Sequence, residues 1–400
     1  METKLDFRST SNYVLGNNKD QFGFYQVGEF KTYSKIEAIE LHHLTGIHPQ
    51  WNFNEEIFSL HNWQQEPVES IEELYARRAH QIRNHYDHVV LMFSGGADST
   101  NILQTFVDNR IPFEEILTFN YHSVDQDPYS FFHSELTRVT YPKIEQLRSQ
   151  GVKFHHRAFD LSEIAHELLT TQSYKITRGY YGTTFFGTSH LAKTYIRERT
   201  PDYQRLAEAG KRVVFVWGAE KPRLYQVNGR YCLRFLDLLD TSVAPRTQLM
   251  ARENEYDELF YWSPNSLDIM TKQGHMLKRF FEKHKLYNEN QDRYISEKTF
   301  KIPSIKTIFD NDLTEDRLTF RDLINKIIYP DWDVGTFTVG KPNKMIISTR
   351  DEHWNKDQEF RQHTVRLIQH IKSIPDYWKN NPKNIFKGVK LCISPPYFLE

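Results

Sequence analysis

The chain of 400 residues contains only two cysteines, Cys232 and Cys392. Two cysteines cannot frame a four-cysteine zinc site or a disulfide scaffold, and such a low number is typical of proteins in a reducing compartment. Long apolar runs are also absent, since no stretch approaches the roughly 20 residues that a membrane-spanning helix needs. The first residues lack the pattern of a signal peptide. The sequence therefore predicts a cytoplasmic protein without a membrane partner.

An excess of charge of either sign is missing as well. The 51 Lys and Arg residues are balanced by 52 Asp and Glu residues, so the net charge is −1. The chain therefore lacks the overall positive charge that would favour a nucleic-acid partner. The length suits two domains or one large domain with additions. We expect an aromatic-rich accessory segment at residues 1–66, an α/β domain at 67–300 and an α+β segment at 301–400.

The most informative stretch runs from His88 to Ser99, HVVLMFSGGADS. Its first six residues are almost entirely apolar, which predicts a strand buried on both faces. The run SGGADS follows, and then apolar residues recur at helical spacing. A glycine-rich turn between a strand and a helix points several main-chain N–H groups into one concavity, and the positive end of the helix adds to it. Such a cradle suits a phosphate or pyrophosphate group.

The alternative is a tight strand–helix turn that uses its glycines only for packing. Such a turn would need neither the hydroxyls of Ser94 and Ser99 nor the carboxylate of Asp98. These three side chains favour the binding interpretation.

Further patterns predict a doubly wound, mostly parallel α/β sheet. Apolar strands are expected at 116–119, 152–156 and 213–217, and helices at 70–85, 142–150 and from about 265. Ligands of such sheets bind beyond the carboxyl ends of the strands, at the point where the strand order reverses. Both the 94–99 turn and the turn that begins at Gly218 should open there.

The turn after the 213–217 strand reads GAEKPR. It contains Lys221 and Arg223, which suit the charge of a phosphate leaving group, and Glu220, which suits base or metal chemistry. The alternative is a surface turn with ordinary charges.

Other local patterns carry weaker expectations. His155 and His156 are expected at the end of their strand and cannot chelate one metal together, because neighbours in a strand face opposite sides. Gln273, His275 and Lys278 are expected to serve packing on an amphipathic helix. A strand is predicted at 22–30, a helix ending at Gly46, a hairpin turning at Asn228–Gly229, a packed turn at 179–190 and a helix at 356–373.

The run SGGADS resembles the SGGxDS signature of the PP-loop ATP pyrophosphatases, a superfamily that includes asparagine, GMP, NAD and lysidine synthetases. It is not a Walker loop, because no Gly-Lys-Ser/Thr follows. The resemblance implies a Rossmann-like fold of the adenine nucleotide alpha hydrolase type, with ATP and Mg²⁺ as cofactors. The low cysteine count argues against the sulfur-transferring and zinc-containing branches.

Site residues follow from the resemblance and from position. Nucleotide contacts are expected from Phe93, Ser94, Gly95, Gly96, Asp98, Ser99, Phe119, Asn120 and Gly218. Asp98 is the candidate Mg²⁺ ligand. The candidate catalytic residues are Asp98, Glu220, Lys221 and Arg223. The turn at Gly218 lacks the Gly-Ala-Asp-Glu run of the asparagine-synthetase-like branch, which leaves its metal ligands open.

The resemblance implies a ligase of the asparagine-synthetase-like branch without the glutaminase domain, because Glu2 stands where a nucleophilic cysteine would be needed. Such an enzyme adenylates a carboxylate or carbonyl oxygen, releases pyrophosphate and transfers ammonia or an amine. Residues 301–400 would complete the pocket of the acceptor, a small molecule. One alternative is a tRNA- or nucleobase-modifying enzyme similar to lysidine synthetase, with RNA as partner. Another is a nucleotide-binding protein that has lost catalysis.

Overall fold

A computed structural model of the chain describes residues 44–120, 136–160, 199–218, 223–235, 253–283, 320–330 and 394–400, with short pieces at 20, 23–32, 38, 41–42, 196 and 293–294. The expected turn at 179–190, the expected helix at 356–373, and both Glu220 and Lys221 lie outside these residues. Among the helices of the described ranges, none has the length and apolar character to cross a membrane.

A five-stranded parallel sheet forms the centre of the molecule, in the order β10-β7-β4-β5-β6. Its strands are β4 (His88–Met92), β5 (Glu115–Asn120), β6 (His155–Asp160), β7 (Val213–Trp217) and β10 (Glu255–Leu259). From β4 the chain adds β5 and β6 on one side, then returns to add β7 and β10 on the other. This order is that of a doubly wound sheet. The predicted α/β fold is therefore confirmed.

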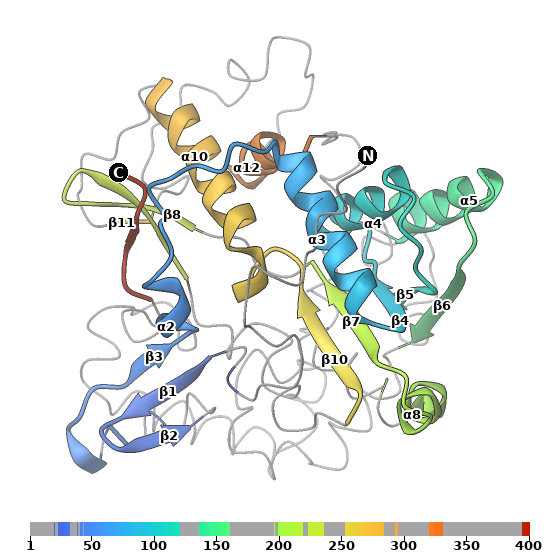
Figure 1. Ribbon diagram of the computed structural model, residues 1–400, viewed down its shortest axis with the longest axis horizontal. Helices are drawn as coiled ribbons and strands as arrows, with labels where there is room; N and C mark the ends of the chain where they lie inside the picture. Colours follow the sequence, from blue (N-terminus) through green and yellow to red (C-terminus); the bar gives the residue numbers. More distant parts are fainter. Residues whose placement is uncertain are drawn as a thin grey trace, which may run out of the picture.

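Helices cover both faces of this sheet (Figure 1). The longer helices of the described ranges are α3 (Ile71–His85), α4 (Ala97–Asp108), α5 (Tyr141–Ser149), α8 (Pro201–Glu208), α10 (Leu267–Lys283) and α12 (Phe320–Ile328), with a π-helical turn at Leu136–Thr140 before α5 and a 3₁₀ turn at Pro264–Ser266 before α10. Of these, α10 packs against α3 and the strands β8 and β9, and α12 packs on α10. Tyr141 of α5 contacts the ring of His156, whereas Tyr203 of α8 contacts Phe215 and Glu115. Because side chains alternate along a strand, His156 and Glu115 mark opposite faces.

The helix predicted at 70–85 begins as the sequence indicates. The Ser70 hydroxyl accepts the Glu73 N–H at 3.2 Å, and the Glu73 carboxylate accepts the Ser70 N–H at 2.7 Å. This reciprocal pair satisfies two main-chain donors at the start of α3.

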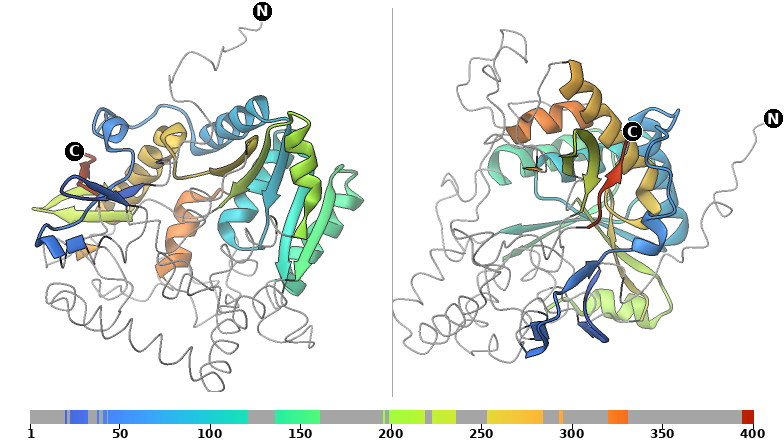
Figure 2. Two further views of the ribbon diagram at one scale, coloured as in Figure 1. Left: turned by 90° about the horizontal axis from the view of Figure 1, so that it is seen from below. Right: turned by 90° about the vertical axis from the view of Figure 1, so that its left-hand side faces the viewer.

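A second, antiparallel sheet has the order β11-β8-β9-β12. Its strands are β8 (Arg223–Val227), β9 (Arg230–Arg234), β11 (Arg293–Tyr294) and β12 (Tyr397–Phe398). Asn228 and Gly229 have φ angles of 50° and 78°, so the predicted two-residue hairpin turn is confirmed. Figure 2 shows from two further directions that β12, near the C-terminus, lies beside this hairpin.

A small sheet near the N-terminus, β2-β1-β3, differs from the expectation. Residues 22–30 do not form one strand: the chain reverses at Gly28, between β1 (Phe24–Val27) and β2 (Phe30–Thr32), and β3 (Gln50–Asn52) pairs with β1. The short helix α2 (Glu55–Phe58) follows β3. The helix ahead of β3 ends at Gly46 as predicted, where φ is 71°.

Two strands of the central sheet also correct the sequence interpretation. The third strand, β6, begins at His155 instead of ending at His156, because it pairs with all six residues of β5. β6 is an edge strand that is only partly buried, so its polar residues do not form the apolar run that would have predicted a strand. The strand β10 was not predicted, because it contains the buried carboxylates Asp257 and Glu258.

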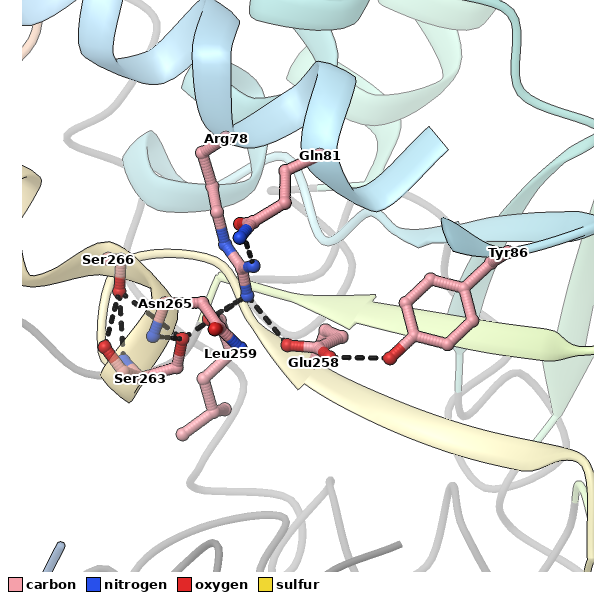
Figure 3. Close-up of polar contacts among 8 residues, drawn as sticks. All are labelled: Arg78, Gln81, Tyr86, Glu258, Leu259, Ser263, Asn265 and Ser266. Atoms are coloured by element: carbon pink, nitrogen blue, oxygen red, sulfur yellow. Dashed lines mark hydrogen bonds and ion pairs between the residues drawn. The ribbon is translucent and has the colours of Figure 1, made fainter. Parts of the chain in front are cut away.

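Partners for these carboxylates explain how β10 can be buried: Asp257 accepts the Trp217 indole N–H at 2.6 Å, and Figure 3 shows the partners of Glu258. The Glu258 carboxylate lies 2.6 Å from the Arg78 guanidinium of α3 and accepts the Tyr86 hydroxyl at 2.5 Å. The same guanidinium donates to the Leu259 carbonyl and the Ser263 hydroxyl, both at 3.3 Å. A buried charge is tolerated when it is paired and hydrogen-bonded in this way. The network joins α3, β10 and the turn that leads into α10.

Candidate functional site

The turn between β4 and α4 combines two differently used glycines. Gly95 has a φ of +83°, a left-handed conformation that other residues adopt only at a cost. Gly96 has an ordinary extended backbone, φ −71° and ψ 162°, and is the N-cap of α4. As a glycine it brings no capping side chain of its own. The helix start is therefore suited to an anion.

The two serines of the turn brace it from within. The Ser99 hydroxyl donates to the Gly96 carbonyl at 3.1 Å and lies 3.3 Å from both the Ser94 main-chain nitrogen and the Ser94 hydroxyl. The Gly96 N–H donates to the Ser94 hydroxyl at 3.3 Å. Ser99 is buried, whereas Ser94 is exposed. The hydroxyls thus fix the shape of the turn, and only Ser94 stands at its open side.

The turn lies where the strand order reverses. β4 and β7 are neighbours, and the chain leaves them in opposite directions along the sheet. Directly after β7, Gly218 approaches the turn so closely that a Cβ atom on it would lie 3.0 Å from the Ser99 nitrogen and 3.1 Å from the Asp98 carbonyl carbon. Gly218 therefore lies against the 94–99 turn, whereas residues 219–222, which continue the second turn, lie outside the described residues. The point where the strand order reverses is the place where doubly wound sheets bind ligands.

Two tyrosines that the sequence did not single out hold Asp98. The Tyr329 hydroxyl donates to the Asp98 Oδ1 at 2.5 Å, and the Tyr261 hydroxyl donates to the Asp98 main-chain carbonyl at 2.8 Å. The Tyr261 hydroxyl also accepts the Asn101 side-chain amide at 2.9 Å. Tyr261 follows β10 at its carboxyl end, so a correct prediction of β10 would have located it. Tyr329 carried no local signal, because it comes from the segment after residue 300.

Both tyrosines remain hydrogen-bond donors at neutral pH. Burial is the main cause that raises the pKa of Tyr261 and of Tyr329 well above the ordinary value, and the negative charge of Asp98 raises both further. Their rings lie 5.6 Å apart between centroids. Asp98, half-buried beside them, is therefore fixed through its main chain and through its carboxylate.

Three more of the expected nucleotide contacts occupy the same end of the sheet strands: Phe93, Phe119 and Asn120. Phe93 is 2% exposed, so a nucleotide contact from it would come through the main chain, whose N–H donates to the Leu117 carbonyl at 2.9 Å. Phe119 and Asn120 end β5. The Phe119 ring is partly buried, 6.3 Å from the Phe159 ring, and the Asn120 side chain is hydrogen-bonded to Tyr141. Their roles toward a nucleotide stay predictions.

Arg223 is not brought into contact with the turn by any described interaction. It begins β8 in the second sheet, opposite Arg234. Four residues lie between it and Gly218, so the two Cα atoms, five steps apart along the chain, are at most about 18 Å apart. The catalytic roles expected of Glu220, Lys221 and Arg223 stay predictions.

The remaining candidates serve packing or lie elsewhere. His155 is exposed and His156 half-buried at the amino end of β6, away from the turn, with the His156 Nε2 3.0 Å from the Thr118 hydroxyl. Burial lowers the pKa of His156. On α10, Gln273 donates to the Tyr75 hydroxyl at 2.9 Å, and His275 lies 3.0 Å from the Trp63 carbonyl. The predicted packing role of these α10 side chains is confirmed.

The donor set of the turn suits one kind of metal. Within the described ranges, no three His, Cys, Asp or Glu residues come together as a metal cage. Mg²⁺ is commonly bound by one or two carboxylates together with substrate phosphates and water. Asp98, in the first turn of α4 behind a glycine N-cap, fits a Mg²⁺ ion that arrives with a nucleotide.

Comparisons with known proteins leave the family open. No protein-family model matches the chain, and no curated protein matches it. Among solved structures, the chain is similar to the crystal structure of NAD⁺ synthetase from Burkholderia pseudomallei, with 13% sequence identity and a TM-score of 0.24 over 57% of this chain and 97% of that one. A TM-score this low carries no conclusion about the activity of this chain, whose fold class rests on its own strand order.

Proposed function

We propose that the chain is an ATP-dependent, AMP-forming ligase of the PP-loop type. One observation carries the proposal: the SGGADS turn lies at the reversal of strand order, with Gly218 against it and a glycine as the N-cap of α4. Main-chain N–H groups at such a helix start bind phosphate groups. The resemblance of SGGADS to the PP-loop signature further indicates which bond of ATP would break.

The reaction consists of two displacements. A carboxylate or carbonyl oxygen of the acceptor attacks the α-phosphorus of ATP, and the bond from that phosphorus to the oxygen that bridges to the β-phosphorus breaks. Pyrophosphate leaves with that oxygen. Ammonia or an amine then attacks the adenylated carbon, AMP departs with the acceptor oxygen, and the nitrogen loses a proton.

The chain would contribute positioning and charge stabilisation. The N–H groups of the turn and of the first turn of α4 would hold the departing pyrophosphate, and Asp98 would hold Mg²⁺. When bound, the ion would offset the charge that develops on the leaving group. Lys221 and Arg223 would add positive charge, and Glu220 would accept the proton of the amine. Phe119 and Asn120 would contact adenine.

The products of ATP cleavage test the proposal. The purified protein is incubated with Mg²⁺, a metabolite extract and ATP labelled at the α- or the γ-phosphate. We expect labelled AMP from the first and labelled pyrophosphate from the second, with a product whose mass reports the acceptor. ADP and inorganic phosphate in their place would contradict the ligase.

Asp98→Ala is the matching variant. It should abolish AMP release while circular dichroism shows a near-native fold, and undiminished turnover would remove the metal role of Asp98. ATP binding without any cleavage, even with the extract, would favour a protein that has lost catalysis. Activity that needs added RNA and falls steeply with salt would favour an RNA-modifying enzyme.

A further inference from the structure

The Asp98 carboxylate of the turn accepts a hydrogen bond from a residue that is distant in the sequence. Tyr329 directly follows α12, and its hydroxyl donates to the Asp98 Oδ1 at 2.5 Å across 231 residues of sequence. Tyr329 is 3% exposed. The contact is therefore partly buried, because the Tyr329 side of it is closed to solvent while Asp98 is half-buried.

Tyr329 is itself fixed by other helices. Its N–H donates to the Asn325 carbonyl at 2.9 Å. The carbonyl of the preceding residue, Ile328, accepts the Tyr75 hydroxyl of α3 at 2.8 Å, and that hydroxyl accepts the Gln273 amide of α10 at 2.9 Å. α12 packs on α10, as Figure 1 shows. The hydroxyl that reaches Asp98 thus has a position set by α3, α10 and α12.

A carboxylate that binds a metal generally needs such support. A carboxylate offers two oxygens with about four acceptor sites, so one hydrogen bond orients it and leaves it able to bind a cation. Partners behind a metal ligand fix its orientation, and their loss typically lowers metal affinity about 10- to 100-fold. Tyr329 has the burial, the donor state and the fixed position that this task requires.

We propose that Tyr329 is a positioning residue of the magnesium–nucleotide site, which orients the Asp98 carboxylate for the cation. The inference rests on the proposed function, because it presumes that Asp98 meets Mg²⁺ with a nucleotide. It goes beyond that proposal by making the segment after residue 300 a part of the nucleotide site. Neither the SGGADS signature nor the strand order contains this residue.

The test compares two variants that each remove one buried tyrosine hydroxyl. Tyr329→Phe removes the bond to Asp98. Tyr86→Phe is the matched control, because the Tyr86 hydroxyl also donates to a buried partner carboxylate, Glu258, at 2.5 Å, and Tyr86 is 2% exposed. ATP binding is measured by titration calorimetry over a series of Mg²⁺ concentrations and in EDTA, without an acceptor. This readout is binding, not turnover.

We expect wild type and Tyr86→Phe to share one midpoint of Mg²⁺ dependence. Tyr329→Phe should need about ten times more Mg²⁺, while its ATP affinity in EDTA changes less than about two-fold. A Tyr329→Phe midpoint equal to that of wild type overturns the inference and leaves the ligase proposal standing. Wild type that binds no ATP at any Mg²⁺ concentration overturns both.

A second variant keeps the test decisive if Tyr329→Phe fails to fold. Tyr75→Phe leaves both Tyr329 and Asp98 in place but removes the hydroxyl that holds the Ile328 carbonyl. We expect its Mg²⁺ midpoint to rise in the same direction by a smaller factor. A midpoint unchanged from wild type in this folded variant would overturn the inference.

Discussion

Gly218 faces the backbone of Ser99 so closely that a Cβ atom added to it would lie 3.0 Å from the Ser99 nitrogen. The end of β7 and the start of α4 are therefore in direct contact. Backbone cannot move aside as the tip of a flexible side chain can, so any residue with a side chain at 218 must displace the turn.

Gly218→Ala should consequently weaken ATP binding about 10-fold or more and destabilise the fold by about 1–3 kcal/mol, the usual cost of overpacking. Gly274→Ala is the matched control. A Cβ atom there would also meet a neighbour at 3.0 Å, but the neighbour is the end of the Leu233 side chain, which belongs to β9 of the second sheet. Calorimetry should find unchanged ATP affinity in the control. Equal affinities in both variants would contradict the site.

Gly96→Val should block nucleotide binding with little strain in the backbone. The φ and ψ of Gly96 are open to valine, so the expected loss comes from a branched side chain that fills the cradle. Valine is also a poor N-cap, which adds about 1 kcal/mol of destabilisation. Binding and urea unfolding are measured on the same preparation. A folded Gly96→Val protein with the ATP affinity of wild type would show that the phosphates bind elsewhere.

The buried pair of Arg78 and Glu258 should dominate the stability of the region around β10. Arg78→Met leaves the Glu258 carboxylate buried with only the Tyr86 hydroxyl as a partner, which should cost about 3–5 kcal/mol. Arg78→Met combined with Glu258→Gln should recover part of this loss, because the uncompensated charge is gone. Urea unfolding of the two single variants and the double variant measures the coupling. Additive losses would show that the pair is not coupled.

The free energy of unfolding at acid pH should depend on an ion pair at the amino ends of β4 and β7, the pair of Asp87 and Arg212. The Arg212 guanidinium, which donates to Asp87 from its Nε at 3.1 Å, is the main cause that lowers the pKa of Asp87 to about 2. A carboxyl group with a lowered pKa in the folded state contributes stability above its unfolded pKa of about 4. That contribution is lost as the pH falls toward 2.

Asp87→Asn should therefore be less stable than wild type at pH 7, by no more than about 1 kcal/mol because the pair is partly exposed. The difference should shrink as the pH falls through 3. Urea midpoints of the two proteins between pH 7 and pH 2.5 measure it, and Arg212→Gln should behave alike. A difference that is independent of pH would rule out the ion pair as its cause.

Much of the central fold could be predicted, because its strands are apolar runs and its turns carry their own signals. β7 is buried at all five positions and reads VVFVW. The predictions for β6 and β10 were wrong or absent for two different physical reasons. β6 is a partly exposed edge strand, and β10 buries charges whose partners, such as Arg78, lie far away in the sequence.

The candidate site likewise contains residues that the sequence predicted and residues that it did not. The 94–99 turn and Gly218 were predictable from the sequence, because the end of an apolar strand and the glycine that follows it are visible in the local sequence. Tyr329 was not, because its importance arises from a tertiary contact that no spacing encodes. The two serines were predicted as ligand contacts, whereas the structure also uses them to brace the turn.

The contact between Tyr329 and Asp98 also orders events during protein synthesis. A ribosome adds β10, the last strand of the central sheet, by residue 259, and only later adds Tyr329. Domains begin to fold from their N-terminal parts while the chain is still growing. The nascent chain thus has all five described strands of its central sheet before Tyr329 exists, so the hydrogen bond to the Asp98 carboxylate can form only when translation has passed α12.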